Sequence, residues 1–281
     1  MTVKHKLMAT TIAAFVCLSG CQTVAVDHHE YETVPDTSAH EETQTEQHED
    51  PHAKPQTKPH WEYTGSHGPA HWAELSDEFT MCATGRLQSP FNITVDIKAY
   101  LPALGLGYNA VPLKVLNNGH TIQVDQADAG QLSVDGKTYN LLQFHFHAHS
   151  EHTIDGKTFP LEMHLVHASA QGELAVVGVM IEEGAPNAEL AKIWQHMPSG
   201  EGEVAQEGLN VEVRKLLPAS RKYARFMGSL TTPPCSEGVN WHMLSTPITA
   251  SAEQIAAFKA IFPMNARPLQ SKNNRLVVAG K

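Results

Sequence analysis

Long apolar runs are absent from this sequence of 281 residues. No stretch reaches about 18 consecutive apolar residues, so we expect no membrane-spanning helix. Internal repeats are absent as well, and the length suits one large domain with tails. Hydrophobic residues make up 41% of the chain, which is an ordinary proportion for a globular core.

Positive charge is also scarce. The chain has 20 lysines and arginines against 30 acidic residues. Within residues 22–60, nine acidic side chains face only two lysines, and large apolar side chains are few. Such a segment buries too little surface to offset its conformational entropy, so we predict that residues 21–60 form a disordered, His-rich tether. The remainder is only mildly acidic, which argues against a nucleic-acid partner.

Only four cysteines occur, and the first two belong to a processing segment. A basic start and a short apolar stretch precede Leu18-Ser19-Gly20-Cys21, which resembles a bacterial lipobox. We therefore expect residues 1–20 to be a signal peptide and Cys21 to carry acyl chains that anchor the protein to a membrane. An ordinary cleaved signal with an incidental cysteine is the alternative. Gln22 favours the bacterial outer membrane, facing the periplasm or the cell surface.

Cys82 and Cys235 remain once the signal peptide, which includes Cys17, and the lipid site are set aside. In an exported domain a disulfide is the default for such a pair. It would close a loop of about 150 residues, which the chain-entropy model values at roughly 4–5 kcal/mol.

Short β-rich runs separated by Gly, Pro and Asn dominate from Trp61 onward. The predicted segments are hairpins over 112–125 and 131–149, strands over 161–169 and 174–182, and helices over 188–197 and 251–262. Asn117-Asn118-Gly119 and Asp135-Gly136 supply the two hairpin turns. We therefore expect a mostly β (α+β) fold: a single domain on a large, mainly antiparallel twisted central sheet with short peripheral helices.

The stretch QFHFHAHSEH, residues 143–152, places several imidazoles along a predicted strand. Side chains at i and i+2 share one face of a strand, so His145 and His147 can converge on one metal ion. A third ligand would come from a neighbouring strand. Either His164 or His167 can supply it, but not both, because residues three apart lie on opposite faces. Three neutral imidazoles leave one open position on a tetrahedral zinc ion, as catalytic sites do.

Two polar residues stand where they could orient these rings. Glu162 lies two residues before His164, and Gln143 lies two residues before His145, on the same faces. A row of solvated or hydrogen-bonded histidines is the alternative. It is disfavoured because the flanking phenylalanines indicate that the opposite face of the strand is buried.

Seven motifs in order resemble the α-class carbonic anhydrases over nearly all of residues 61–275. They are HWAELSDEF (71–79), GRLQSP (85–90), NNGH (117–120), QFHFHAHSEH (143–152), EMHLVH (162–167), GSLTTPPCSEGVNW (228–241) and RPLQ (267–270). The resemblance implies that residues 61–281 are the catalytic domain of a zinc (Zn2+) lyase that hydrates carbon dioxide reversibly to bicarbonate and a proton. It implies His145, His147 and His164 as ligands, His149 as a polar neighbour, and His152 and His167 as structural residues.

The resemblance also implies the catalytic residues. Zinc-bound hydroxide attacks carbon dioxide, and water then displaces the bicarbonate. Thr231 accepts a hydrogen bond from this hydroxide and donates one to Glu151. The residues implied at the substrate site are Val166, Val176, Leu230, Thr232, Val239 and Trp241.

His120 matches the position that carries the released proton to solvent, for which an imidazole titrates in the right range. Tyr63, Asn118 and Gln123 match positions that order the intervening water. Ala148 departs from relatives that often have tryptophan behind the ligand strand, and the smaller side chain must be compensated locally or loosen the site. The resemblance also suggests a cis peptide bond at Pro234.

Two other functions compete with this reading. A non-catalytic relative that uses the fold for binding typically lacks a ligand histidine, whereas all three are present here. A periplasmic zinc-handling protein is suggested by the His-rich tether, and deleting residues 22–60 would remove most of its capacity but leave an enzyme's turnover intact. The expected partners are carbon dioxide and bicarbonate, together with a membrane through Cys21, and a homodimer is an open alternative.

Overall fold

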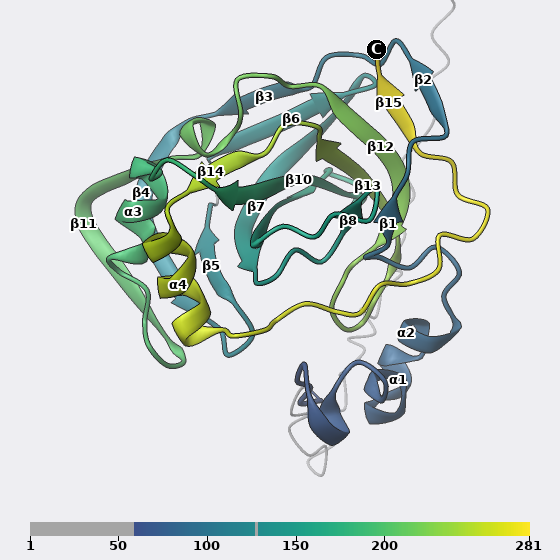
Figure 1. The fold of residues 1–281 in the computed structure, drawn as a ribbon, viewed down its shortest axis with the longest axis horizontal. Helices are drawn as coiled ribbons and strands as arrows, with labels where there is room; N and C mark the ends of the chain where they lie inside the picture. The colour runs from purple at the N-terminus through teal and green to yellow at the C-terminus, as the bar shows by residue number, and fades with distance from the viewer. Residues whose placement is uncertain (1–58, 127–128) are drawn as a thin grey trace, which may run out of the picture. The chain divides into compact units, whose positions relative to one another are not determined.

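The computed structural model describes residues 59–126 and 129–281. The predicted signal peptide, the lipid site at Cys21 and nearly all of the tether lie outside these residues. Within the described part no helix is both long and apolar enough to cross a bilayer. Strands dominate and helices are few and short, which confirms the mostly β (α+β) prediction (Figure 1).

One 13-stranded sheet forms the body of the domain. Its main path runs β11-β4-β5-β7-β9-β10-β13-β12-β15-β2, with β3, β6 and β14 paired beside it (Figure 1). Its strands are β2 (Ile97–Ala99), β3 (Gly105–Tyr108), β4 (Ala110–Asn117), β5 (Ile122–Asp125), β6 (Gly130–Val134), β7 (Lys137–His147), β9 (Leu161–Ala168), β10 (Leu174–Glu183), β11 (Gly202–Glu212), β12 (Tyr223–Ser229), β13 (Glu237–Leu244), β14 (Ile248–Ala250) and β15 (Val278–Gly280). A separate two-stranded sheet pairs β1 (Asn92–Ile93) with β8 (Thr153–Ile154).

The large sheet is mainly antiparallel, as expected, but it is mixed. β10 pairs in parallel with both β13 and β14, and β15 pairs in parallel with β2. The chain therefore returns to the middle of the sheet after long excursions. This places β13 one strand away from β9, with only β10 between them, and brings Trp241 of β13 close to His164 of β9.

Both predicted hairpins form. β4 and β5 pair with Val115 opposite Val124, and β6 and β7 pair around Asp135 and Gly136. These two turn residues have φ of 52° and 73°, which a tight two-residue hairpin turn requires and glycine adopts without strain. The other two predicted strands correspond to β9 and β10, each within one residue of the expected end.

The two predicted helices also form. α3 (Ala188–Trp194) ends three residues before the predicted end, and α4 (Ala252–Ile261) begins with a capping box of Ser251 and Gln254. The sequence patterns missed the remaining helical segments because these are shorter than the repeat that periodicity needs. They are α1 (Trp72–Leu75), α2 (Met81–Thr84) and the 3-10 turns η1 (Gly65–His67), η2 (Asp77–Phe79) and η3 (Val213–Leu216).

Strand β7 separates a hydrophobic core from a polar site because its side chains alternate. Phe144 and Phe146 are fully buried in the larger core cluster, to which α3 and α4 also contribute. His145 and His147 point to the other face, where Trp241 belongs to a second apolar cluster. One strand therefore provides both core packing and the candidate site.

Candidate metal centre

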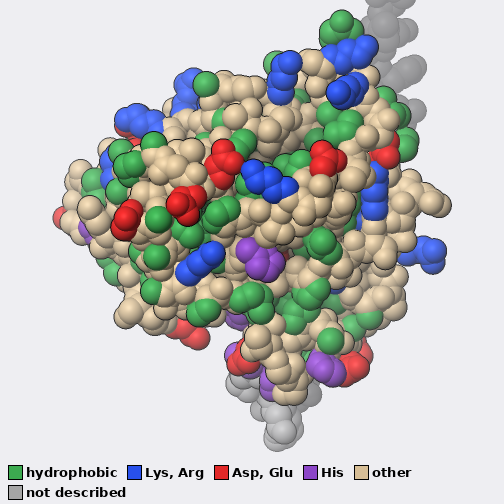
Figure 2. All heavy atoms as spheres, in the orientation of Figure 1, with side chains coloured by type: hydrophobic (Ala, Val, Ile, Leu, Met, Phe, Trp, Pro, Cys, Tyr) green, Lys and Arg blue, Asp and Glu red, His purple; other side chains and the backbone are tan. Residues whose placement is uncertain are grey.

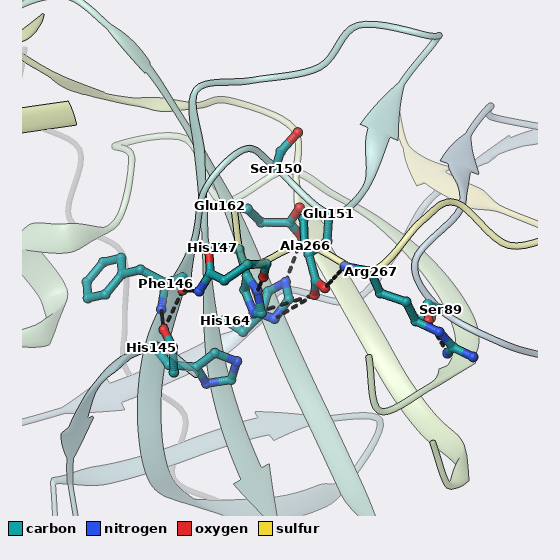
Figure 3. Close-up of polar contacts among 12 residues, drawn as sticks. Ser89, His145, Phe146, His147, Ser150, Glu151, Glu162, His164, Ala266 and Arg267 are labelled. Carbon is teal, nitrogen blue, oxygen red and sulfur yellow. Dashed lines mark hydrogen bonds and ion pairs between the residues drawn. The ribbon is translucent and has the colours of Figure 1, made fainter. Parts of the chain in front are cut away.

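Three histidines from two neighbouring strands converge in the structure. β7 supplies His145 and His147, β9 supplies His164, and His145 lies directly opposite His164 in the register. The ring centroids are 4.6–5.2 Å apart, and one nitrogen of each ring lies within 4.8 Å of the others. Figure 3 shows the three imidazoles grouped on one side of the ribbon, with Phe146 pointing away.

On two of these rings an oxygen acceptor determines which nitrogen carries the proton. Nδ1 of His147 lies 2.8 Å from the backbone oxygen of Asn265, and Nε2 of His164 lies 2.7 Å from Oε1 of Glu162. These oxygens only accept, so both nitrogens donate. Nε2 of His147 and Nδ1 of His164 therefore keep free lone pairs, and the former is buried with no hydrogen-bond partner in the described part of the chain.

The third ring is held in the same way. Nδ1 of His145 lies 2.8 Å from Oε1 of Gln143, which leaves Nε2 of His145 free. Burial lowers the pKa of both His145 and His147, and the rings of the neighbouring histidines lower that of His145 further. The His145 and His147 rings are therefore neutral, as ligation requires. Three free imidazole nitrogens around one point fit a zinc ion with an open fourth position.

Glu162 is fixed by His152 as well as by the ring it orients. The backbone N–H of His152 donates to Oε2 at 2.8 Å, and its Nδ1 lies 2.9 Å from Oε1. Burial alone would raise the pKa of Glu162, but His152 and His164 outweigh it and lower that pKa, so the carboxylate is ionised. These three residues are also close enough to hold a metal, but their facing atoms already hydrogen-bond to one another.

Asn265 is a residue that the sequence patterns missed. It is fully buried, its backbone oxygen accepts from His147, and its amide nitrogen Nδ2 donates to the backbone oxygens of His120 and Phe146. It also pairs with both backbone groups of Ala148: its Oδ1 accepts from the N–H and its own N–H donates to the carbonyl. Its only sequence signal is its place two residues before the RPLQ motif.

Glu151 lies beside the ligands, buried and partly paired. Its Oε1 accepts from the backbone N–H of Arg267 at 2.9 Å, and its Oε2 lies 3.4 Å from Nε2 of His147 (Figure 3). Oε2 faces the imidazoles of His147 and His164, and it has no hydrogen-bond partner among the described residues. The hydrogen bond from Thr231 that the resemblance implies is therefore not formed in this structure, although Thr231 is buried in the adjoining loop.

The residues expected at the substrate site come together beside the histidines. Val176, Val239 and Trp241 are buried in one apolar cluster, against which Val166 and Leu230 pack. The ring of Trp241 lies 4.9 Å from that of His164. Thr232 is partly buried in the loop between Leu230 and β13. The cluster of three histidines therefore has an apolar wall on the Trp241 side.

Comparison with known proteins agrees with this geometry. A family model described as eukaryotic-type carbonic anhydrase matches residues 67–281. The carbonic anhydrase of Pectobacterium carotovorum is 46% identical over 220 residues, which cover 78% of this chain and 90% of the relative. The chain belongs to the α-class carbonic anhydrase family. It is therefore an enzyme that acts on carbon dioxide and bicarbonate.

Solved carbonic anhydrases have the same fold. The Thermovibrio ammonificans α-carbonic anhydrase, solved with the inhibitor sulfanilamide, is 44% identical with a TM-score of 0.76 and covers 79% of this chain and 100% of its own. The Photobacterium profundum α-carbonic anhydrase is 45% identical with a TM-score of 0.74, covering 78% and 100%. Both matches span the described domain, so its whole architecture is that of the family.

A carbonic anhydrase must also release a proton, and His120 stands at the turn between β4 and β5. Its ring stacks on Trp61 with centroids 3.7 Å apart, and its Nε2 lies 2.9 Å from the backbone oxygen of Trp61. That oxygen only accepts, so Nε2 carries the proton and Nδ1 is free. Asn118 accepts from the backbone N–H of His120 and reaches Gln123 at 3.5 Å. Trp61 was not singled out by the sequence patterns.

Three further residues named from the sequence lie outside the set of three histidines, and His167 lies on the other face of the sheet. Burial and then Glu151 raise the pKa of Tyr63, so its hydroxyl stays protonated. His149 is exposed, with Nδ1 2.7 Å from the backbone oxygen of Ser150. His167 lies on the opposite face of β9 and contacts the hydroxyl of Tyr108 at 2.8 Å.

The predicted disulfide between Cys82 and Cys235 is confirmed. It joins α2 to the loop that carries Thr231, and the peptide bond before Pro234 is cis, as the resemblance suggested. The buried guanidinium of Arg267 donates to the backbone oxygen of Cys82 at 2.9 Å. The disulfide thus ties the loop that carries Thr231 to α2, and the hydrogen bond from Arg267 holds the α2 end of that link.

Proposed function

We propose that this carbonic anhydrase is a zinc enzyme whose metal ion is held by Nε2 of His145, Nε2 of His147 and Nδ1 of His164. The observation that carries the proposal is the convergence of three ring nitrogens, each freed because the other nitrogen of its ring has an oxygen partner. A bound zinc ion supplies Lewis acidity, which makes water a nucleophile near neutral pH.

The chain's own residues then prepare the substrate. Carbon dioxide is apolar, so Val176 and Trp241 offer it a dry surface beside the ligands. We propose that a rotation of the Thr231 side chain pairs its hydroxyl with Oε2 of Glu151, the acceptor that lacks a partner within the described range. The lone pairs of Thr231 would then face the nucleophile and select for a group that has a proton to donate.

Proton release is assigned to His120. Its free Nδ1 takes up the proton, and the proton already on Nε2 can leave to solvent once the contact with the backbone oxygen of Trp61 opens. One proton has then been transferred and the ring is neutral in its other tautomer, and proton exchange with water restores the free Nδ1. An imidazole suits this relay because its pKa lies near the working pH.

The ligand set is tested by replacing His164 and His149 with alanine, one at a time. The His164→Ala protein should lose zinc and hydration activity, because it removes one of three ligands. His149→Ala should keep both, since its ring contacts a backbone oxygen outside the set. Zinc content by mass spectrometry and stopped-flow hydration decide the matter. Zinc loss in His149→Ala, with retention in His164→Ala, would contradict the assignment.

We also propose that the enzyme is exported and lipid-anchored through Cys21, with the tether between anchor and domain taking no part in catalysis. The lipobox-like Leu18-Ser19-Gly20-Cys21 and the acidic, His-rich residues 22–60 support this. Cys21→Ser should move the protein from the membrane fraction to the soluble fraction. Deleting residues 22–60 should leave turnover unchanged, whereas slower reloading with scarce zinc would favour a zinc-collecting role.

A further inference from the structure

A surface pocket lies at the end of the large sheet that contains β2, β12 and β15, away from the three histidines. Its volume is about 290 Å³, near the lower end of ligand pockets, which run from roughly 300 to 1,000 Å³. The segment after β2, the start of β12 and the last two residues of the chain line it. None of these lining residues belongs to the metal centre or to the apolar wall beside it.

Arg221 lines this pocket with an unsatisfied guanidinium. Its Nη1 is buried and has no hydrogen-bond partner among the described residues. Burial lowers the pKa of Arg221, and the like charge of Arg214 lowers it further, while only the Tyr108 hydroxyl acts in the other direction. A partly buried cation with neither a carboxylate nor a full set of acceptors is costly to hold. An anion in the pocket would lower that cost through the charge of the guanidinium and through its nitrogens other than the buried Nη1.

The surroundings of Arg221 are positive, although the whole chain has a net charge of −10. Lys222 and Lys281 line the same pocket, and the ion pairs found in the described residues use other lysines and arginines. Figure 2 shows lysine and arginine side chains gathered at the upper edge, where Figure 1 marks the C-terminus. Three cationic side chains line the pocket against the one α-carboxylate that Lys281 carries, so the local charge is still positive and attracts anions.

The pocket also offers apolar contact. Tyr100 is 89% exposed, and the ammonium of Lys281 lies over its ring, 5.2 Å from the centroid. The rest of the apolar lining comes from Leu101, Pro102, Ala103 and the largely buried Tyr223. An inorganic anion alone would leave these apolar surfaces exposed to solvent, whereas an anion attached to a compact organic group would cover them.

We propose that this pocket binds a small organic oxyanion, a phosphate or carboxylate on an aromatic or short aliphatic body, with Arg221 as its anchor. The planar guanidinium fork suits both head groups because it can donate two parallel hydrogen bonds. Lys222 and Lys281 add charge at the rim, and the exposed ring of Tyr100 receives the body of the ligand. The site is separate from carbon dioxide hydration.

Phenyl phosphate is the probe, measured by isothermal titration calorimetry on the zinc-loaded, full-length Cys21→Ser chain with sulfanilamide present to block the metal centre. We expect a dissociation constant of about 1 mM or tighter. Arg221→Gln should weaken binding about tenfold or more, because it removes charge-assisted hydrogen bonds. Arg86→Gln, which removes an exposed arginine elsewhere, should bind like the parent, and both variants should hydrate carbon dioxide at the parental rate.

A second arm separates a free ligand from a lipid head group. Vesicles of phosphatidylglycerol and of phosphatidylcholine are compared with the same three proteins. Binding to phosphatidylglycerol alone that depends on Arg221, without binding of phenyl phosphate, would assign the site to a lipid head group. Equal binding by Arg221→Gln and the parent in both arms would overturn the proposal. So would phenyl phosphate binding that sulfanilamide abolishes, because the probe would then be occupying the metal centre.

Discussion

Single acceptor atoms determine the chemistry of each histidine in this carbonic anhydrase. Oxygens of Gln143, Asn265 and Glu162 each engage one ring nitrogen, and the other nitrogen of the ring is left for a metal. Glu162 is the most firmly held of the three, because His152 contacts both of its carboxylate oxygens. The orientation of the three histidines is thus set by residues outside the proposed ligand set.

Replacing Glu162 by glutamine should weaken zinc binding by about 10–100-fold while the protein stays folded. The glutamine amide carries no negative charge. Its NH2 group can also face Nε2 of His164, which is itself a donor, so the hydrogen bond would be lost. Competition with a chelator measures the affinity. The matched control is Glu182→Gln, which changes an exposed carboxylate paired with Lys157. Parental zinc affinity in Glu162→Gln would show that the ring needs no such partner.

Replacing His120 by alanine should slow turnover in dilute buffer by at least about tenfold, with little change in kcat/KM. Only the proton relay is lost, because His120 is outside the proposed ligand set and contacts Trp61 instead. Added imidazole should restore part of the rate. His149→Ala serves as the control. Equal turnover of His120→Ala and the parent in dilute buffer would remove this histidine from the relay.

At the scale of elements, sequence patterns predicted the parts with strong local signals. Both hairpins carry glycine in their turns, and α3 and α4 are long enough to show periodicity. β11 escaped prediction because it is an edge strand with mostly exposed side chains and a bulge, so no apolar alternation marks it. α1 and α2 have four residues each, which is about one helical turn.

The candidate site could be predicted from the sequence only in part. His145 and His147 follow from strand geometry, but the choice of His164 over His167 required the resemblance to a family. Asn265 could not be found from local spacing, because it lies 118 residues from His147 and acts through its backbone oxygen. A backbone acceptor leaves no residue-type signal in a single sequence.

Replacing Cys82 by serine should lower the free energy of unfolding by roughly 2–5 kcal/mol, since the bond spans 153 residues. It should also reduce hydration activity modestly below the melting temperature, because Cys235 lies in the loop that carries Thr231. Denaturant unfolding and stopped-flow assays measure the two effects. Full activity of the folded variant would show that the disulfide is not needed to position the loop that carries Thr231. Two reactive thiols in the unreduced parent would contradict the bond itself.

At the scale of the whole molecule, buried histidines on the other face of the sheet make stability depend on pH. Burial lowers the pKa of His167 to about 3 and, together with the charge of Arg225, that of His242 to about 4. The unfolded chain titrates near 6.5. Below this pH the unfolded state therefore binds more protons than the native state, and stability is lost as the pH falls toward these lowered values.

We expect the free energy of unfolding to be highest above pH 6.5 and to fall by on the order of 1–2 kcal/mol per histidine by pH 5. Replacing His242 by phenylalanine should reduce the loss between pH 7.5 and 5, whatever its effect on stability at pH 7.5. Urea unfolding at both pH values measures it. A parental pH slope in His242→Phe would show that this ring does not titrate in the unfolding transition.

The central claim is that zinc on His145, His147 and His164 makes this chain a carbon dioxide hydratase. Stopped-flow hydration, followed with a pH indicator, tests it most directly on the protein as purified, after chelation, and after reloading with one equivalent of zinc. The account predicts fast hydration, then loss to the uncatalysed rate, then recovery at one zinc per chain, with no recovery in the His164→Ala protein. Unchanged hydration by the fully metal-free protein, or full recovery by His164→Ala, would contradict it.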